Sequence, residues 1–176
     1  MSAKTANDFR LGFLTTISLQ DRGHVGGMLI TNPQGRPLEF QCTTPVQANR
    51  TQQILYGPTL LPYLRGELIG RTLVEKMRVK PTVVLVDDLE LLSVREHISM
   101  AAACLIDSAT PSGADEMVIA GQRLKLAEGH TDDRAALEQL EGTLAAESEL
   151  SEPFQRIQDA LSEALGKAAA PTREAA

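Results

Sequence analysis

Two consecutive acidic residues follow an apolar stretch near the middle of the chain. In TVVLVDDLELL (residues 82–92), a run of aliphatic residues leads into Asp87 and Asp88. Such a run is typical of a strand covered on both faces, and ligands of open α/β sheets bind where strands end. A carboxylate there can hold a metal ion or cap the next helix. Because Glu90 follows Asp87 by three residues, as in a capping box, we interpret Asp87 as a helix cap.

Several catalytic motifs that need such a strand are absent from the sequence. An aspartate at a strand end is part of the Walker B element, but its partner GxxxxGK[ST] does not occur, and neither does GxGxxG. Without the glycine cradle and the lysine, P-loop nucleotide hydrolysis is excluded. GxSxG is missing, which leaves an α/β-hydrolase elbow unsupported. His24, His97 and His130 lack the HxH or HExxH spacing of a metal site.

The first half of the chain predicts a meander and a long helix. Residues 11–19, 25–31 and 38–42 alternate or concentrate apolar side chains as strands do, and the sequences QDRGH and NPQGRP between them are turn signals. These three segments predict an antiparallel meander. Apolar residues then recur at helical spacing, which predicts a short turn at 51–56 and a main helix over about 59–78.

The rest of the chain predicts another strand and two acidic helices. ISMAAACLI is either a helical continuation or a buried strand, and we favour the strand. We divide the chain into an α/β core domain (8–107), a linker with a candidate edge hairpin (108–130), an amphipathic helical hairpin (131–168) and a disordered tail (169–176). The expected fold class is α/β (α+β): a three-stranded antiparallel meander, a long helix, a buried parallel-type strand in a mixed sheet, and the C-terminal acidic helical hairpin.

The order of elements over residues 11–88 resembles that of endonuclease V, a nuclease of the ribonuclease H-like type. The resemblance consists of the meander, PYLRGELIGRTL on a helix, and a strand that closes in an aspartate. It implies a Mg²⁺ site with Glu67 and Asp87 as ligands. Such nucleases also carry an aspartate within the first strand, and LGFLTTISL has none. Without that carboxylate, two-metal chemistry loses a central ligand.

A proline-containing segment between the meander and the helix is the strongest candidate for binding. EFQCTTPVQANRTQQILYGPTLLPY places amide side chains, an arginine and both tyrosines of the chain around three prolines. Amide and guanidinium groups suit recognition of a peptide or polar ligand by hydrogen bonding. The alternative interpretation is a rigid loop that covers a sheet edge. As ligand- or partner-binding residues we predict Arg50, Gln53, Tyr56 and Tyr63.

The charge of the chain is unevenly distributed. The formal net charge is −6. Residues 1–110 contain 11 Lys and Arg against 10 Asp and Glu, whereas residues 111–176 contain 6 against 13. Binding to a phosphate backbone normally needs a basic surface, so the near-neutral first part argues against nucleic acid as a main partner.

Localisation and function follow from these exclusions. The N-terminus is not a secretory signal, no apolar run approaches the ~20 residues that span a bilayer, and Cys42 and Cys104 are isolated, which together indicate a cytoplasmic protein without membrane partners. We expect a non-catalytic binding or assembly module without a cofactor, more consistent with a binding protein than with an enzyme, that engages a protein partner or itself. The alternative is a metal-dependent nuclease of degenerate ribonuclease H-like type that uses Mg²⁺.

Overall fold

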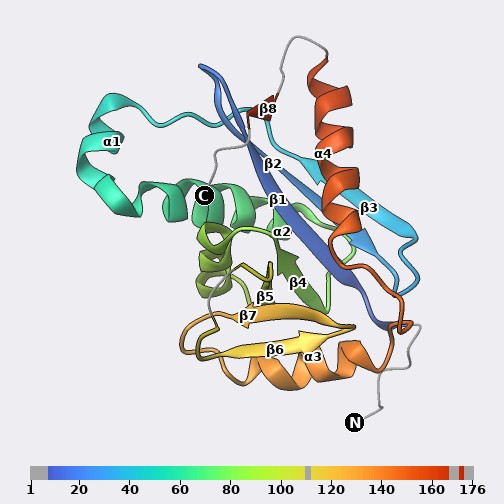
Figure 1. Ribbon diagram of the computed structural model, residues 1–176. Coiled ribbons are helices and arrows are strands. Elements are labelled where there is room, and N and C mark those ends of the chain that lie inside the picture. The colour runs from blue at the N-terminus through green and yellow to red at the C-terminus, as the bar shows by residue number, and fades with distance from the viewer. Residues whose placement is uncertain (1–7, 110–111, 167–170, 173–176) are drawn as a thin grey trace.

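A computed structural model describes residues 8–109, 112–166 and 171–172 (Figure 1). Its centre is a single mixed sheet with the strand order β3-β2-β1-β4-β5-β7-β6, and β8 pairs with β1 outside this path. The strands are β1 (Leu11–Leu19), β2 (Gly23–Thr31), β3 (Pro37–Cys42), β4 (Val83–Val86), β5 (Ala101–Ile106), β6 (Glu116–Ile119), β7 (Gln122–Leu126) and β8 (Pro171–Thr172).

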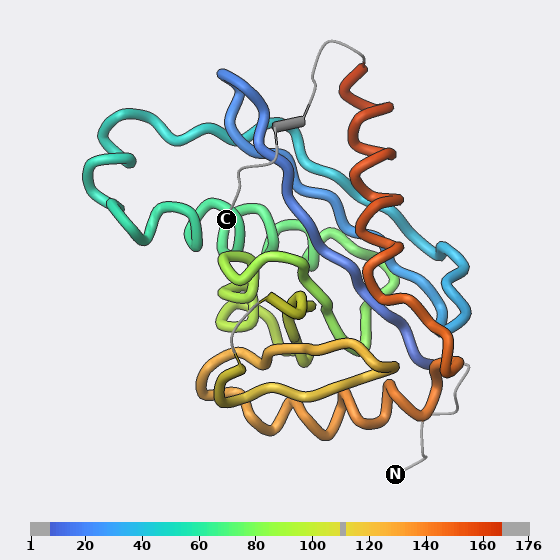
Figure 2. The backbone as a smooth tube through the Cα atoms, in the orientation of Figure 1, coloured from blue at the N-terminus to red at the C-terminus, as the bar shows by residue number. Residues whose placement is uncertain are grey.

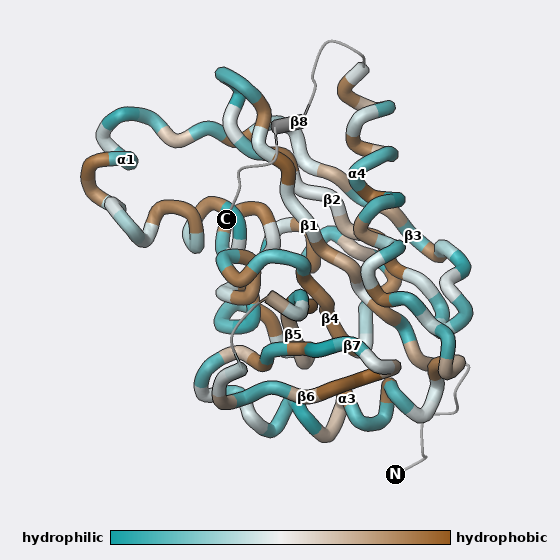
Figure 3. The backbone as a smooth tube through the Cα atoms, in the orientation of Figure 1, coloured by the Kyte–Doolittle hydropathy of each residue, from teal (hydrophilic) through white to brown (hydrophobic). Residues whose placement is uncertain are grey.

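The pairing confirms the mixed α/β fold predicted from the sequence. β1, β2 and β3 form the antiparallel meander. β4 lies between β1 and β5 and runs parallel to both. All four residues of β4 are fully buried, and the strand is hydrophobic along its length in Figure 3. The uninterrupted apolar sequence is explained by helices on both faces of this central strand.

Two helical layers cover the sheet, as the chain path in Figure 2 shows. Helices from the middle of the sequence cover one face, and α3 and α4 cover the other. The helical elements are α1 (Arg50–Tyr56), the 3₁₀ turn η2 (Gly57–Thr59), the π-helical η3 (Pro62–Gly70), α2 (Arg71–Lys76), the 3₁₀-helical η4 (Leu89–His97), α3 (Asp133–Glu141) and α4 (Glu152–Leu165).

Alternation along the strands sends side chains into two separate cores. On β1, Phe13 belongs to the core under α3 and α4, and Leu14 belongs to the core under η3, α2 and η4. On β4, Leu85 faces the first core and Val86 the second. The side of the sheet that a residue faces therefore follows from its parity along the strand.

Two glycines of β2 allow the helices to approach the sheet closely. A Cβ atom on Gly26 would lie 2.1 Å from a methyl carbon of Ile69 in η3, and one on Gly27 would lie 2.5 Å from a methyl carbon of Ile157 in α4. Any larger side chain would push one of the helices away. The consecutive glycines thus set the spacing of both layers.

The C-terminal helices differ from the predicted helical hairpin. α3 packs on β5 and β6, whereas α4 packs on β1 and β2 (Figure 1). Each helix packs on a different apolar part of the sheet. The loop of residues 142–151 is long enough to let α3 and α4 lie apart. The buried side chains Leu137 and Ile157 both contribute to the same core.

Two further expectations are met in the central part of the chain. Residues 101–106 form the strand β5, as favoured from the sequence, after a 3₁₀-helical η4 rather than a long α-helix. β6 and β7 form an antiparallel hairpin at the sheet edge. Within the described ranges, no helix has the length and apolar character needed to cross a membrane.

Candidate functional site

A cleft opens where β4 ends. β4 stops at Val86, whereas β1 continues to Leu19 and β5 to Ile106, so the two outer strands extend past the central one. The space beyond β4 is a cleft of about 1230 Å³, which we call the strand-end cleft. Its walls come from β1, η4, the end of β5, the β6–β7 turn and the start of α4. Clefts at the carboxyl ends of parallel strands are the usual ligand sites of α/β sheets.

Asp87 faces the α4 side of this cleft. Asp87 lies two residues after Leu85 and therefore points to the same face of the sheet, the face that α4 covers. It borders a smaller cavity of about 410 Å³ together with Phe154, Gln155 and Gln158 of α4. The hydroxyl of Thr15 on β1 donates a hydrogen bond to Asp87, with 3.0 Å between Oγ1 and Oδ2. Thr15 is 2% exposed, and the contact as a whole is partly buried.

Asp88 faces the opposite layer, towards η3. Its Oδ2 accepts a hydrogen bond from the guanidinium of Arg65, and its Oδ1 accepts one from the backbone amide of Glu90 at 2.9 Å. The side chain of Arg65 is 9% exposed and that of Asp88 is 30% exposed. Asp88 is thus the carboxylate that ties η4 to η3.

The interpretation of Asp87 as the helix cap is therefore wrong by one residue. Asp88 has the extended backbone of an N-cap and its side chain accepts from the first turn of η4. The capping-box spacing pointed to Asp87 because it assumed an α-helix with its third residue, N3, at Glu90. A 3₁₀ turn is tighter, and the cap moves one residue closer.

The donor set does not fit a multi-carboxylate metal centre. In the part of the chain that the structure describes, no three His, Cys, Asp or Glu side chains converge on a common point. The predicted ligand pair is not brought together: Glu67 lies on η3, 4.0 Å from His97, and is not among the described residues that line the cleft. Strand parity places Asp87 on the other face of the sheet. The two-ion arrangement implied by the resemblance has no counterpart here.

The negative charges of Asp87 and Asp88 affect the pKa of a buried thiol, Cys104. Cys104 on β5 pairs in register with Val86, directly before the two acids. Burial, followed by the negative charges of Asp87 and then Asp88, raises the pKa of the Cys104 thiol to about 12. The thiol is therefore protonated at neutral pH and does not act as a nucleophile or a metal ligand.

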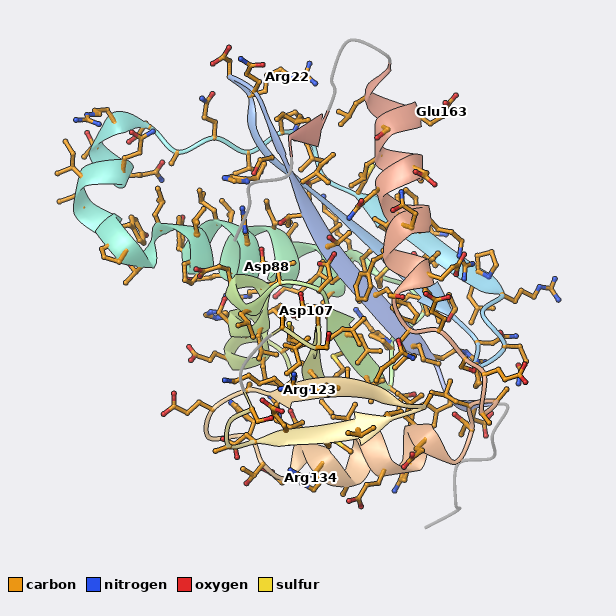
Figure 4. All side chains as sticks on the ribbon, viewed as in Figure 1. Arg22, Asp88, Asp107, Arg123, Arg134 and Glu163 are labelled. Carbon is orange, nitrogen blue, oxygen red and sulfur yellow. The ribbon has the colours of Figure 1, made fainter. Side chains whose placement is uncertain are left out.

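Other residues of the strand-end cleft were missed from the sequence. Asp107 follows the apolar strand β5 just as Asp87 follows β4, and this repeated pattern was the available signal. Asp107, Arg123 and Asp88 border the cleft together (Figure 4). Gln155 and Gln158 belong to α4, and nothing in their local sequence distinguishes them from ordinary surface amides.

The predicted binding residues lie on a projecting arm. Residues 47–63, which we call the α1 arm, extend away from the sheet, and α1 has no buried residue (Figure 1). Tyr56 and Tyr63 stack with ring centroids 4.3 Å apart. Desolvation, followed by the side-chain hydrogen bond that protonated Tyr56 makes with Tyr63, raises the pKa of Tyr56. Gln53 donates to the carbonyl of Ala48.

The tip of the arm exposes apolar and cationic groups. Ile54 is 65% exposed and Leu55 is 76% exposed, and Arg50 next to them is exposed. The structure thus brings together three of the predicted residues, Arg50, Gln53 and Tyr56, on one short helix. It places none of the four among the residues that line the strand-end cleft.

Comparison with solved structures identifies similar proteins, but no protein-family model and no curated protein sequence matches the chain. Two complexes of endonuclease V from Ciona intestinalis with inosine-containing DNA share 10% identity with this chain, at TM-scores of 0.46 and 0.47 and coverage of 87–89% of this chain and 86–87% of theirs. Human ENDOV shares 12% identity, at a TM-score of 0.44, and the match covers 90% of this chain and 86% of that one. At this level of likeness the activity of the present chain has to be argued from its own side chains.

The comparison corrects two expectations. The similar structures are endonucleases, two of them bound to DNA, whereas the sequence analysis expected a non-catalytic binding or assembly module that engages a protein partner or itself. The expectation that nucleic acid is not a main partner is corrected too. The average charge of residues 1–110 hides residues 50–80, which contain six Lys and Arg against two Glu.

Proposed function

We propose that this chain takes a nucleic-acid strand in the strand-end cleft, as a degenerate nuclease of the ribonuclease H-like type. The observation that carries the proposal is the lining of the cleft, which is rich in hydroxyl and amide groups: Thr15, Thr16, Ser18, Gln122, Ser151, Gln155 and Gln158. Side chains of these types, with arginine, make most protein contacts to phosphate and sugar oxygens. They come from β1, the β6–β7 turn and α4.

The cleft also carries acidic groups, and one of them, Asp87, lies beside Thr15 of β1 and borders a cavity with Gln155 and Gln158 of α4. Asp87, Asp88 and Asp107 all follow the ends of β4 and β5. Arg65 compensates the charge of Asp88, and Thr15 donates to Asp87. Phosphate contacts therefore fall to the hydroxyl and amide groups of the cleft and not to its carboxylates.

The α1 arm is the second contact surface that we propose. Stacking of a base on an aromatic ring contributes roughly 1–3 kcal/mol in single-strand binding, and exposed apolar side chains can insert between bases. Tyr56 and Tyr63 already form a stacked pair, with Arg50 and Gln53 on the same arm. These four residues would contact the nucleic-acid strand outside the cleft, where the local charge is positive.

The compartment that we propose is the cytoplasm. Cys42 and Cys104 are both free thiols in the structure. Thiols remain reduced where glutathione and thioredoxin act, whereas small secreted domains usually pair their cysteines.

Binding to the cleft is tested by placing negative charge on its donor-rich wall. Fluorescence anisotropy with labelled single-stranded DNA and RNA of about 12 nucleotides, within the usual site size, should show binding by the wild type. Gln155→Glu with Gln158→Glu should weaken it about tenfold or more, because two carboxylates would face the phosphates. Gln139→Glu, an exposed residue of α3 outside the cleft, is the matched control. Equal loss in both variants, or no binding by the wild type, would refute the proposal.

Binding to the arm is tested through the salt dependence. Arg50→Gln should reduce the slope of log K against log salt by about 0.7, the value for one single-strand phosphate contact. Arg22→Gln, on the exposed β1–β2 turn (Figure 4), should leave the slope unchanged. A slope that is insensitive to Arg50→Gln would remove the arm from the binding surface while leaving the cleft in place.

A further inference from the structure

We infer that the hydrogen bond between Thr15 and Asp87 takes the place of a divalent cation in the strand-end cleft, and that Thr15 is the residue that keeps the cleft from binding one. Exclusion of a cation by Thr15 would hold whether or not the cleft takes nucleic acid. It concerns the neutral hydroxyl that this chain places beside a strand-end carboxylate, on the face where the cleft is open.

The positions of the two side chains follow from the strand register. Leu14 of β1 is in register with Val86 of the parallel β4, so Thr15 and Asp87 are the next residues on the two neighbouring strands. Both have the parity that faces α4, and Oγ1 of Thr15 lies 3.0 Å from Oδ2 of Asp87. Oxygen ligands at about 2.1 Å from Mg²⁺ in octahedral geometry are about 3.0 Å from their neighbours. The two oxygens thus have the spacing of adjacent ligands, with a hydroxyl proton between them.

Charge decides what occupies this position. The threonine hydroxyl donates a hydrogen bond to the carboxylate. Because the hydroxyl is neutral, the pair has a single negative charge for a cation to neutralise. Asp88 cannot add a second charge, because it faces the other layer and binds Arg65. Two carboxylates about 3 Å apart do not both stay ionised without a proton or cation between them. An aspartate at position 15 would therefore make a cation the preferred partner of Asp87.

The test is a gain of cation binding in Thr15→Asp, followed by calorimetric titration with Mn²⁺ and Mg²⁺ and by thermal unfolding. The variant should melt below the wild type in EDTA, and its Tm should rise by roughly 5–10 °C at a Mn²⁺ concentration ~100 times the dissociation constant. The wild type should show no Tm response to Mn²⁺ beyond that of its Asp87→Asn variant. Thr15→Asn, which keeps the size without the charge, should also lack a response.

Two controls assign the effect to the pair. Adding Asp87→Asn to Thr15→Asp should abolish the cation response. Thr16→Asp adds the same charge one position along β1, where strand parity directs the side chain to the same layer as Leu14, opposite to α4, and should give no Asp87-dependent site. These comparisons separate a defined cation site from a general response to added negative charge.

Three results would overturn the inference. Saturable Mn²⁺ binding by the wild type that Asp87→Asn removes would mean that the hydroxyl itself serves as a ligand. A folded Thr15→Asp variant that binds no cation would mean that the geometry is unsuitable. A variant that stays unfolded with Mn²⁺ present would have the same meaning, because a bridging cation should restore the fold. None of these readouts uses nucleic acid, so they fail or succeed apart from the proposed function.

Discussion

The two sides of the end of β4 differ although their acids are consecutive in sequence. On the η3 side, Asp88 forms a largely buried ion pair with Arg65 and caps η4. On the α4 side, Asp87 meets the hydroxyl of Thr15 and borders an open cleft. The first side is a structural tie between helices, and the second is a site with room for a ligand. Two adjacent carboxylates thus serve different purposes because a strand directs alternate side chains to opposite faces.

The largest expected effect is on stability, and it comes from removing the ion pair between Arg65 and Asp88 on the η3 side. Arg65→Met should lower the free energy of unfolding by about 2–4 kcal/mol, because it leaves Asp88 without its cation in a mostly buried position. Urea denaturation followed by circular dichroism measures the loss. Adding Asp88→Asn should recover part of it, since no charge then remains unpaired. A loss below about 0.5 kcal/mol for Arg65→Met, typical of a surface substitution, would show that the tie is unimportant.

A smaller effect is expected on the alkylation rate of Cys104, which compares the charges of Asp87 and Asp88. Because burial is the main cause of its raised pKa, Asp87→Asn and Asp88→Asn should each speed its alkylation by only about two- to fivefold. The effect of Asp87→Asn should be at least as large, since its charge raises the pKa more than that of Asp88. The thiolate fraction rises about tenfold per pH unit below the pKa, so iodoacetamide labelling near pH 9, read by mass spectrometry, is sensitive enough. Exposed Cys42 is the internal control. Alkylation of Cys104, relative to Cys42, that neither substitution speeds would contradict the effect of the two charges.

Much of the fold follows from local pattern in the sequence. The period of two in residues 11–19 and the unbroken apolar run of β4 gave correct strands, because each reflects burial that the strand itself requires. The placement of α3 and α4 did not follow. Their apolar stripes specify which side is buried but not which partner they pack on, so a hairpin and two separate contacts look alike in sequence.

The candidate site was predictable in part. Asp87 was singled out because a strand end can be recognised in sequence, and its parity against Asp88 was already visible in TVVLVDD. Thr15 could not be found this way, since its role depends on the parallel register of β1 with β4, which joins residues 72 positions apart. Gln155 and Gln158 reach the cleft only through the packing of α4 on the sheet.

The most direct test of the account is a titration of the wild type with Mn²⁺ followed by NMR of its backbone amides, in which a bound paramagnetic ion broadens signals around its site. The account predicts no saturable broadening centred on Thr15 and Asp87, because a hydroxyl proton fills the position between them. In Thr15→Asp, the same titration should selectively broaden residues in the middle of β1 and at the end of β4. Selective broadening around Asp87 and Asp88 together in the wild type would show that the two acids share a cation, which the account excludes.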